Sequence, residues 1–169
     1  MKHIVIAPVG DHMGDLFVGV REFPTERVIL VTDSKKLEEA EKAKKELEKF
    51  KIPVQIRKLP DEGHVWEKTF EAIADIKKLE KDSNLLINVS TGDRDTRCAA
   101  TSAAFVNGLR AFAVDGSEAM LLPVLKFSYY KMLTDRKLDI LKVLIKDPKC
   151  CSSLDELSKK TGMSLPLIS

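Results

Sequence analysis

Several features that would point to a function are scarce or missing in this chain of 169 residues. It has three cysteines and three histidines, and neither kind is spaced like the ligands of a zinc site. Because Cys150 and Cys151 are adjacent, the cysteines make a poor disulfide framework and predict a reduced, cytoplasmic protein. No apolar run approaches the length of a membrane span, and the first predicted strand begins too early for a signal peptide. We therefore expect no metal, no other cofactor and no membrane anchor.

The chain also lacks a strong charge of either sign. Its formal net charge is +2, with 32% charged and 44% hydrophobic residues, which is typical of an ordinary globular protein and excludes disorder. From Lys126 onward the nine Lys and Arg residues outnumber the five Asp and Glu residues. The cationic excess therefore lies in the C-terminal part of the chain.

Short apolar runs alternate with amphipathic segments along the first 126 residues, which predicts strands alternating with helices. The predicted strands are 3–7, 27–32, 53–59, 84–89, 110–114 and a hairpin partner at 119–125. The predicted helices are 11–22, 34–50, 64–81 and 93–107. Their inward faces are expected to include Leu37, Leu47, Phe50, Trp66, Ile73, Ile76 and Leu79. This order predicts an α/β, doubly wound, mostly parallel Rossmann-like sheet, in which ligands bind beyond the carboxyl ends of the strands.

The pattern becomes entirely helical after residue 126. Thr134 is expected to cap one helix and Ser153 a second, with Glu156 completing a capping box. Gly162 then predicts a turn before a new helix, and this succession is typical of a helix-turn-helix. We predict a ligand-binding domain at 1–126 and a partial winged helix-turn-helix, a DNA-binding region, at 127–169. Because only residues 164–169 follow the turn, we expect weak or absent DNA binding by this chain alone.

The most informative local feature is a polar turn between the fourth predicted strand and its helix. It consists of Ser90, Thr91, Gly92, Asp93 and Arg94. Hydroxyls, backbone N–H groups and a guanidinium at a helix N-terminus suit a phosphate or another anion, and Asp93 or Thr91 is expected to cap the helix. The alternative is that any strand-to-helix turn needs such residues. Small alanines on the helix behind the turn, together with Arg94 and Arg97, favour an anion site.

A second candidate loop, residues 8–14, follows the first predicted strand and contains Gly10, Asp11 and His12. It lies beside the polar turn if strands one and four are neighbours. Its glycines do not have the spacing of a dinucleotide fingerprint, and no Walker lysine follows. A lone histidine in a loop is more often a hydrogen-bonding group than a catalyst, so we assign no catalytic residue.

Residues Asn88 to Arg94 resemble the N-V-S-G/S-G-T-K turn of CARF domains, the CRISPR-associated Rossmann fold. Residues 8–12 resemble the first-strand loop of the same domains. A CARF-like body followed by a helix-turn-helix is also similar to archaeal CARF-type transcriptional regulators. Thr91, Asp93 and Arg94 depart from the usual turn, and Asp93 adds a negative charge where the family has a threonine.

The resemblance implies a homodimer that binds a cyclic oligoadenylate, most often the tetra-adenylate, across a two-fold axis and changes its affinity for DNA. It places Ser90, Thr91, Gly92 and Arg94 against the ligand, with Gly10, Asp11 and His12 opposite. Some relatives cleave the ring slowly, so a metal-independent ring nuclease is one alternative. An unrelated nucleotide-binding α/β protein is another.

Overall fold

The computed structural model describes residues 2–123, 134–147, 151 and 153–168. The chain divides into two compact units, Met1–Lys126 and Phe127–Ser169. The end of the sixth predicted strand, beyond residue 123, lies outside the described residues.

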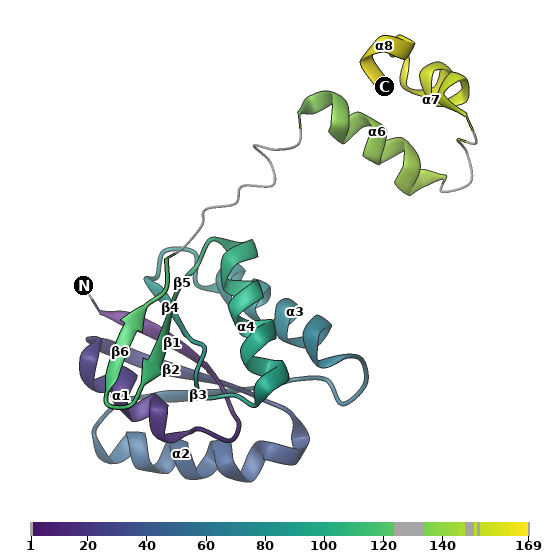
Figure 1. Cartoon of the computed structure of the whole chain (residues 1–169). Helices are drawn as coiled ribbons and strands as arrows, with labels where there is room; N and C mark the ends of the chain where they lie inside the picture. Colours follow the sequence, from purple (N-terminus) through teal and green to yellow (C-terminus); the bar gives the residue numbers. More distant parts are fainter. Residues whose placement is uncertain (1, 124–133, 148–150, 152, 169) are drawn as a thin grey trace. The chain divides into compact units, whose positions relative to one another are not determined.

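Unit 1 is built on a six-stranded sheet with the order β3-β2-β1-β4-β5-β6 (Figure 1). The strands are β1 His3–Pro8, β2 Thr25–Thr32, β3 Val54–Lys58, β4 Leu85–Asn88, β5 Arg110–Asp115 and β6 Glu118–Leu121. The pairs β1–β2, β1–β4, β2–β3 and β4–β5 are parallel, whereas β6 pairs with β5 in the antiparallel sense. The sequence-based prediction of a mostly parallel, Rossmann-like sheet is therefore confirmed.

Helices cover both faces of this sheet, α1 and α2 on one and α3 and α4 on the other (Figure 1). The helices are α1 Gly14–Glu22, α2 Leu37–Lys49 after the 3₁₀ turn η1 Ser34–Lys36, α3 Val65–Leu79 and α4 Arg94–Asn107. Side chains of the central strand alternate between the two cores, because Ile4 and Ile6 pack on the α3–α4 side and Val5 and Ala7 on the other. Full burial of each large aliphatic side chain contributes about 1.5–3 kcal/mol.

Four side chains expected to face inward are exposed, and Leu37 is one of them at 37%. Phe50 is 70% exposed, Leu79 75% and Trp66 43%. All four lie at the first two or the last positions of a helix or just beyond it, whereas Leu47 and Ile73 lie further inside their helices and are fully buried. Helical periodicity thus predicts which face of a helix is apolar, but it does not predict how far along the helix that face is covered by the sheet.

Unit 2 contains α6 Asp135–Lys146, α7 Leu154–Thr161 and α8 Leu165–Ile168. The predicted caps are confirmed, since the Thr134 side chain accepts the Lys137 N–H and the Ser153 side chain accepts the Glu156 N–H. Gly162, with φ of +70°, closes α7 in the left-handed conformation that favours glycine. Within α6 and α7 no residue is buried.

Two further features concern the cysteines and the membrane. Cys98 is a free, exposed thiol, whereas Cys151 is disulfide-bonded, so the expectation of reduced cysteines is wrong at that position. Within the described parts of the chain, no helix has both the length and the apolar character needed to cross a bilayer.

Candidate functional site

The predicted site loops meet where the strand order reverses in unit 1. From β1 the chain runs outward to β2 and β3, and from β4 it runs the other way to β5. β1 and β4 are parallel neighbours, with Ile6 opposite Ile87, so their carboxyl ends lie at the same edge of the sheet. Such a topological switch point is where open α/β sheets bind ligands.

Direct contacts join the loop after β1 to the turn after β4. The Thr91 hydroxyl donates to the Pro8 carbonyl at 2.6 Å, and the His12 N–H donates to the Thr91 carbonyl at 3.2 Å. Gly10 lies directly against the turn, because a Cβ added to it would be 2.4 Å from the Asp93 nitrogen. The two loops that the sequence singled out therefore form one structure.

The hydroxyls of Ser90 and Thr91 point into the protein. Ser90 is 1% exposed, and its oxygen accepts the Val114 N–H at 2.7 Å. The pairing of β4 with β5 ends at Asn88 and Phe112, so the Val114 N–H needs another partner on that side. Thr91 is fully buried. In this structure both hydroxyls therefore hold the turn in shape, and neither faces solvent as a phosphate contact would require.

Asp93 is the N-cap of α4 and forms an ion pair across the site. One carboxylate oxygen accepts the Thr96 N–H at 2.9 Å and the Thr96 hydroxyl at 2.6 Å. The other oxygen pairs with the ammonium of Lys36, at the end of η1. Of the two caps expected from the sequence, Asp93 is the one used.

The protonation of this ion pair follows from its surroundings. Partial burial alone would raise the pKa of Asp93, but the hydrogen bonds from Lys36 and Thr96 outweigh it and lower that pKa to about 2. Burial alone would lower the pKa of Lys36, and the hydrogen bond and charge of Asp93 raise it overall. Both groups are therefore charged at neutral pH.

The groups that face outward are Asp11, His12 and Arg94, all exposed. Within the described residues, none of these three side chains has a hydrogen-bond or ion-pair partner. Gly92 is buried under Thr96, whose hydroxyl would be 2.5 Å from an added Cβ. Arg94 is the first residue of α4, and the first N–H groups of a helix lack partners within it. An anion at this edge would meet a guanidinium, a histidine and a helix N-terminus, and also the carboxylate of Asp11.

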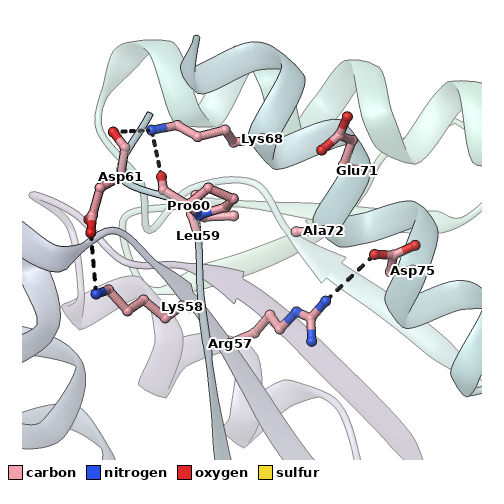
Figure 2. Close-up of a pocket in the computed structure, with 9 residues that line it drawn as sticks. All are labelled: Arg57, Lys58, Leu59, Pro60, Asp61, Lys68, Glu71, Ala72 and Asp75. Atoms are coloured by element: carbon pink, nitrogen blue, oxygen red, sulfur yellow. Dashed lines mark hydrogen bonds and ion pairs between the residues drawn. The ribbon is translucent and has the colours of Figure 1, made fainter. Parts of the chain in front are cut away.

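A separate cleft of about 370 Å³ lies between the end of β3 and α3 (Figure 2). Two ion pairs lie within it, Arg57 with Asp75 and Lys58 with Asp61, each at 3.5 Å, whereas the Glu71 carboxylate has no partner among the described residues. Lys68 turns its ammonium to the Pro60 carbonyl at 2.9 Å (Figure 2). Because most of these groups already pair with one another, the candidate functional site remains the β1–β4 edge. The described residues contain no group of three His, Cys, Asp or Glu side chains that could hold a metal ion.

Two site residues were not recognised from the sequence. Lys36 lies in the predicted helix 34–50 among many other Lys and Glu residues, although it closely follows β2 at the relevant edge. Asn88 ends an apolar strand and is fully buried. Its amide donates to the Asp15 carbonyl at 3.2 Å and accepts the Ser90 N–H at 2.9 Å. The sequence signal for Asn88 was a polar amide within an otherwise apolar run.

Known proteins resemble this chain in sequence family and in fold. The family described as "HFX_2341_N:-like, N-terminal" matches residues 3–119. No curated protein matches the sequence. Among solved structures, protein VC1899 from Vibrio cholerae is 14% identical, with a TM-score of 0.64 over 75% of this chain and 34% of its own.

Two other solved structures contain cyclic nucleotides. Can2 from Sulfobacillus thermosulfidooxidans, in complex with cyclic tetra-adenylate, is 15% identical, with a TM-score of 0.58 over 95% of this chain and 57% of its own. Csm6 from Enterococcus italicus, bound to cyclic hexa-2′-fluoro-hexa-dAMP, is 13% identical, with a TM-score of 0.61 over 95% of this chain and 49% of its own. The chain thus spans between about a third and somewhat over half of these three proteins. The likenesses show the fold, which is the Rossmann-like fold that the CARF resemblance implied.

Proposed function

This chain belongs to the HFX_2341_N:-like, N-terminal family, and from that premise we propose that unit 1 binds a cyclic oligoadenylate. The main support is the junction of the loop after β1 with the turn after β4 at the topological switch point. That junction presents Arg94 and the start of α4 to an anion. The same fold occurs in Can2 solved with cyclic tetra-adenylate and in Csm6 solved with a cyclic hexanucleotide.

The residues at this junction have different parts in the proposed binding. Asp11, His12 and Arg94 are exposed and would contact the ligand with their side chains. The backbone of Gly10 and Gly92 would line the approach to the start of α4. Ser90, Thr91 and Asp93 would act by holding the turn, through their hydrogen bonds to Val114, Pro8 and Thr96.

We further propose a homodimer, because a cyclic oligoadenylate with two-fold symmetry can receive the same donors from two copies of one site. Unit 2 would then be the effector, a partial helix-turn-helix formed by α7, the turn at Gly162 and α8. Ligand binding would change the affinity of this unit for DNA, as in the archaeal CARF-type transcriptional regulators, which also join a CARF-like body to a helix-turn-helix. Such a regulator would act in the cytoplasm.

Titration calorimetry with cyclic tetra-adenylate tests the proposed binding directly. We expect micromolar or tighter binding by the full chain, and a loss of about tenfold or more in Arg94→Ala, since a charged hydrogen bond contributes about 1.5–3 kcal/mol. Arg110→Ala is the matched control, because Arg110 is exposed at the start of β5, at the opposite edge of the sheet. No binding by the unmodified chain, or equal affinities for both variants, would contradict the proposal.

Cleavage is tested separately by incubating the chain with labelled cyclic tetra-adenylate without metal. We expect the ring to remain intact, because the junction has no group that we assign to catalysis. Linear products would instead identify a ring nuclease. Binding of mononucleotides without binding of the ring would indicate an unrelated nucleotide-binding protein.

A further inference from the structure

We propose that Lys36 is a positioning residue of the ligand site, where its ion pair with Asp93 lets an anionic ligand approach the start of α4. The inference rests on the proposed function, because it concerns the same site. Lys36 and Asp93 are 57 residues apart in the sequence and come from η1 and the N-cap of α4. Their pairing connects the end of β2 with the turn that follows β4.

Hydrogen bonds fix the backbone around Lys36, and this helps to direct its ammonium towards Asp93. The Asp33 side chain accepts the N–H groups of Lys35 and Lys36, each at 3.0 Å. The Lys36 side chain is 25% exposed, and that of Asp93 is 34% exposed. A small cavity of about 60 Å³, lined by Lys36, Thr96 and the apolar side chains of Val9 and Val31, lies beside this pair. Partial burial makes the pair more effective than an ion pair in open water.

The charges near the pair explain why it matters for an anion. Asp11, Asp33 and Asp93 put three carboxylates near this edge, and Asp11 and Asp33 both act on the Lys36 ammonium. Without Lys36, the carboxylate of Asp93 would remain at the helix N-terminus with no cation bound to it. An approaching phosphate would then meet a like charge only a few ångströms away. Lys36 therefore offsets the negative charge by which this turn departs from the CARF pattern.

Two substitutions with opposite expected effects test the inference. We expect Lys36→Met to weaken binding of cyclic tetra-adenylate about tenfold, because it exposes the Asp93 charge. Asp93→Asn should instead strengthen binding about threefold or more, because it frees the Lys36 charge, and asparagine caps helices as well as aspartate does. The double variant should bind within about threefold of the unmodified chain, since it removes a neutral pair.

Lys42→Met is the matched control, because Lys42 pairs with Glu38 on the exposed face of α2. Its affinity should equal that of the unmodified chain. Thermal unfolding followed at Trp66, the only tryptophan, reports whether each variant is folded. If Lys36→Met does not fold, Asp93→Asn still tests the inference, because its expected change has the opposite sign.

The outcomes distinguish a failure of this inference from a failure of the proposed function. Absence of binding by the unmodified chain refutes the proposed function, and this inference with it. Binding by the unmodified chain with equal affinity in Lys36→Met refutes the inference alone. A double variant as weak as Lys36→Met would mean that Lys36 contacts the ligand itself, which overturns the positioning role. Weaker binding by Asp93→Asn would also overturn it.

Discussion

Replacing Gly10 with alanine should destabilise unit 1 and separate the two loops of the site. The added Cβ would lie 2.4 Å from the Asp93 nitrogen, 2.7 Å from the Gly92 carbonyl carbon and 2.8 Å from the Gly92 Cα. All three are backbone atoms, so no side chain can turn aside to make room. Carbon atoms pack best at about 3.5–4.0 Å, so one loop must move by about 1 Å.

The cost of this movement follows from overpacking and from the contacts that it strains. Forcing an extra carbon into a close-packed region costs about 1–3 kcal/mol. The movement also stretches the hydrogen bond from the His12 N–H to the Thr91 carbonyl, now 3.2 Å, and a typical hydrogen bond contributes about 1 kcal/mol. We therefore expect the free energy of unfolding of unit 1 to fall by about 1–4 kcal/mol.

Gly14→Ala is the matched control within the same stretch of chain. A Cβ on Gly14 would have nothing within 4 Å, and Gly14 is the first residue of α1. Alanine is favoured over glycine in a helix by up to about 1 kcal/mol, so this variant should be as stable as the unmodified chain or more stable. Urea unfolding followed by the fluorescence of Trp66 in α3 measures unit 1 alone. Equal midpoints for the two alanine variants would refute the reasoning about close backbone approach.

Two further predictions concern pH and the apolar faces of the helices. The folded-state pKa of Asp93 is about 2, below its unfolded value of about 4, so its contribution to stability is complete above pH 4 and is lost between about pH 4 and 2. Acid unfolding of Asp93→Asn should lack that part of the pH dependence. Identical acid unfolding profiles for Asp93→Asn and the unmodified chain would contradict the ion pair. Near the C-terminal end of α2, Leu47→Ala should cost about 2–5 kcal/mol and Phe50→Ser, just beyond the helix, less than about 0.5 kcal/mol, because Leu47 is fully buried and Phe50 is 70% exposed. Equal urea midpoints for these two variants would contradict the burial.

Much of the fold could be predicted because the strands are short apolar runs bounded by turn residues. The run from His3 was expected to end near Ala7, and β1 ends at Pro8. The caps at Ser153 and Thr134 depend only on neighbouring residues, so local chemistry was sufficient to predict them. Local sequence could not predict the strand order, because β1 and β4 are adjacent through pairs such as Ile4 with Leu85, which lie far apart in the sequence.

The position of the two candidate loops could be predicted from the sequence, whereas the contacts of their side chains could not. Residue types identified both loops, because glycine, hydroxyl and charged residues follow apolar strands there. The direction of the Ser90 hydroxyl depends on a free N–H at Val114 in another strand, which the sequence of the turn does not reveal. Likewise the partner of Asp93 is Lys36, one lysine among many in a charged run. Contacts between distant elements decided these details.

The pairing of β1 with β4 has a consequence for how the protein acquires its function. The segment between Ile4 and Leu85 contains β2, β3 and three helices, so this pairing closes a long loop and is entropically expensive. The two candidate ligand loops meet only once it has formed. A nascent or partly unfolded chain that contains only the first three strands would therefore lack the candidate site, and a ligand of that site could bind only to molecules in which this pairing has formed.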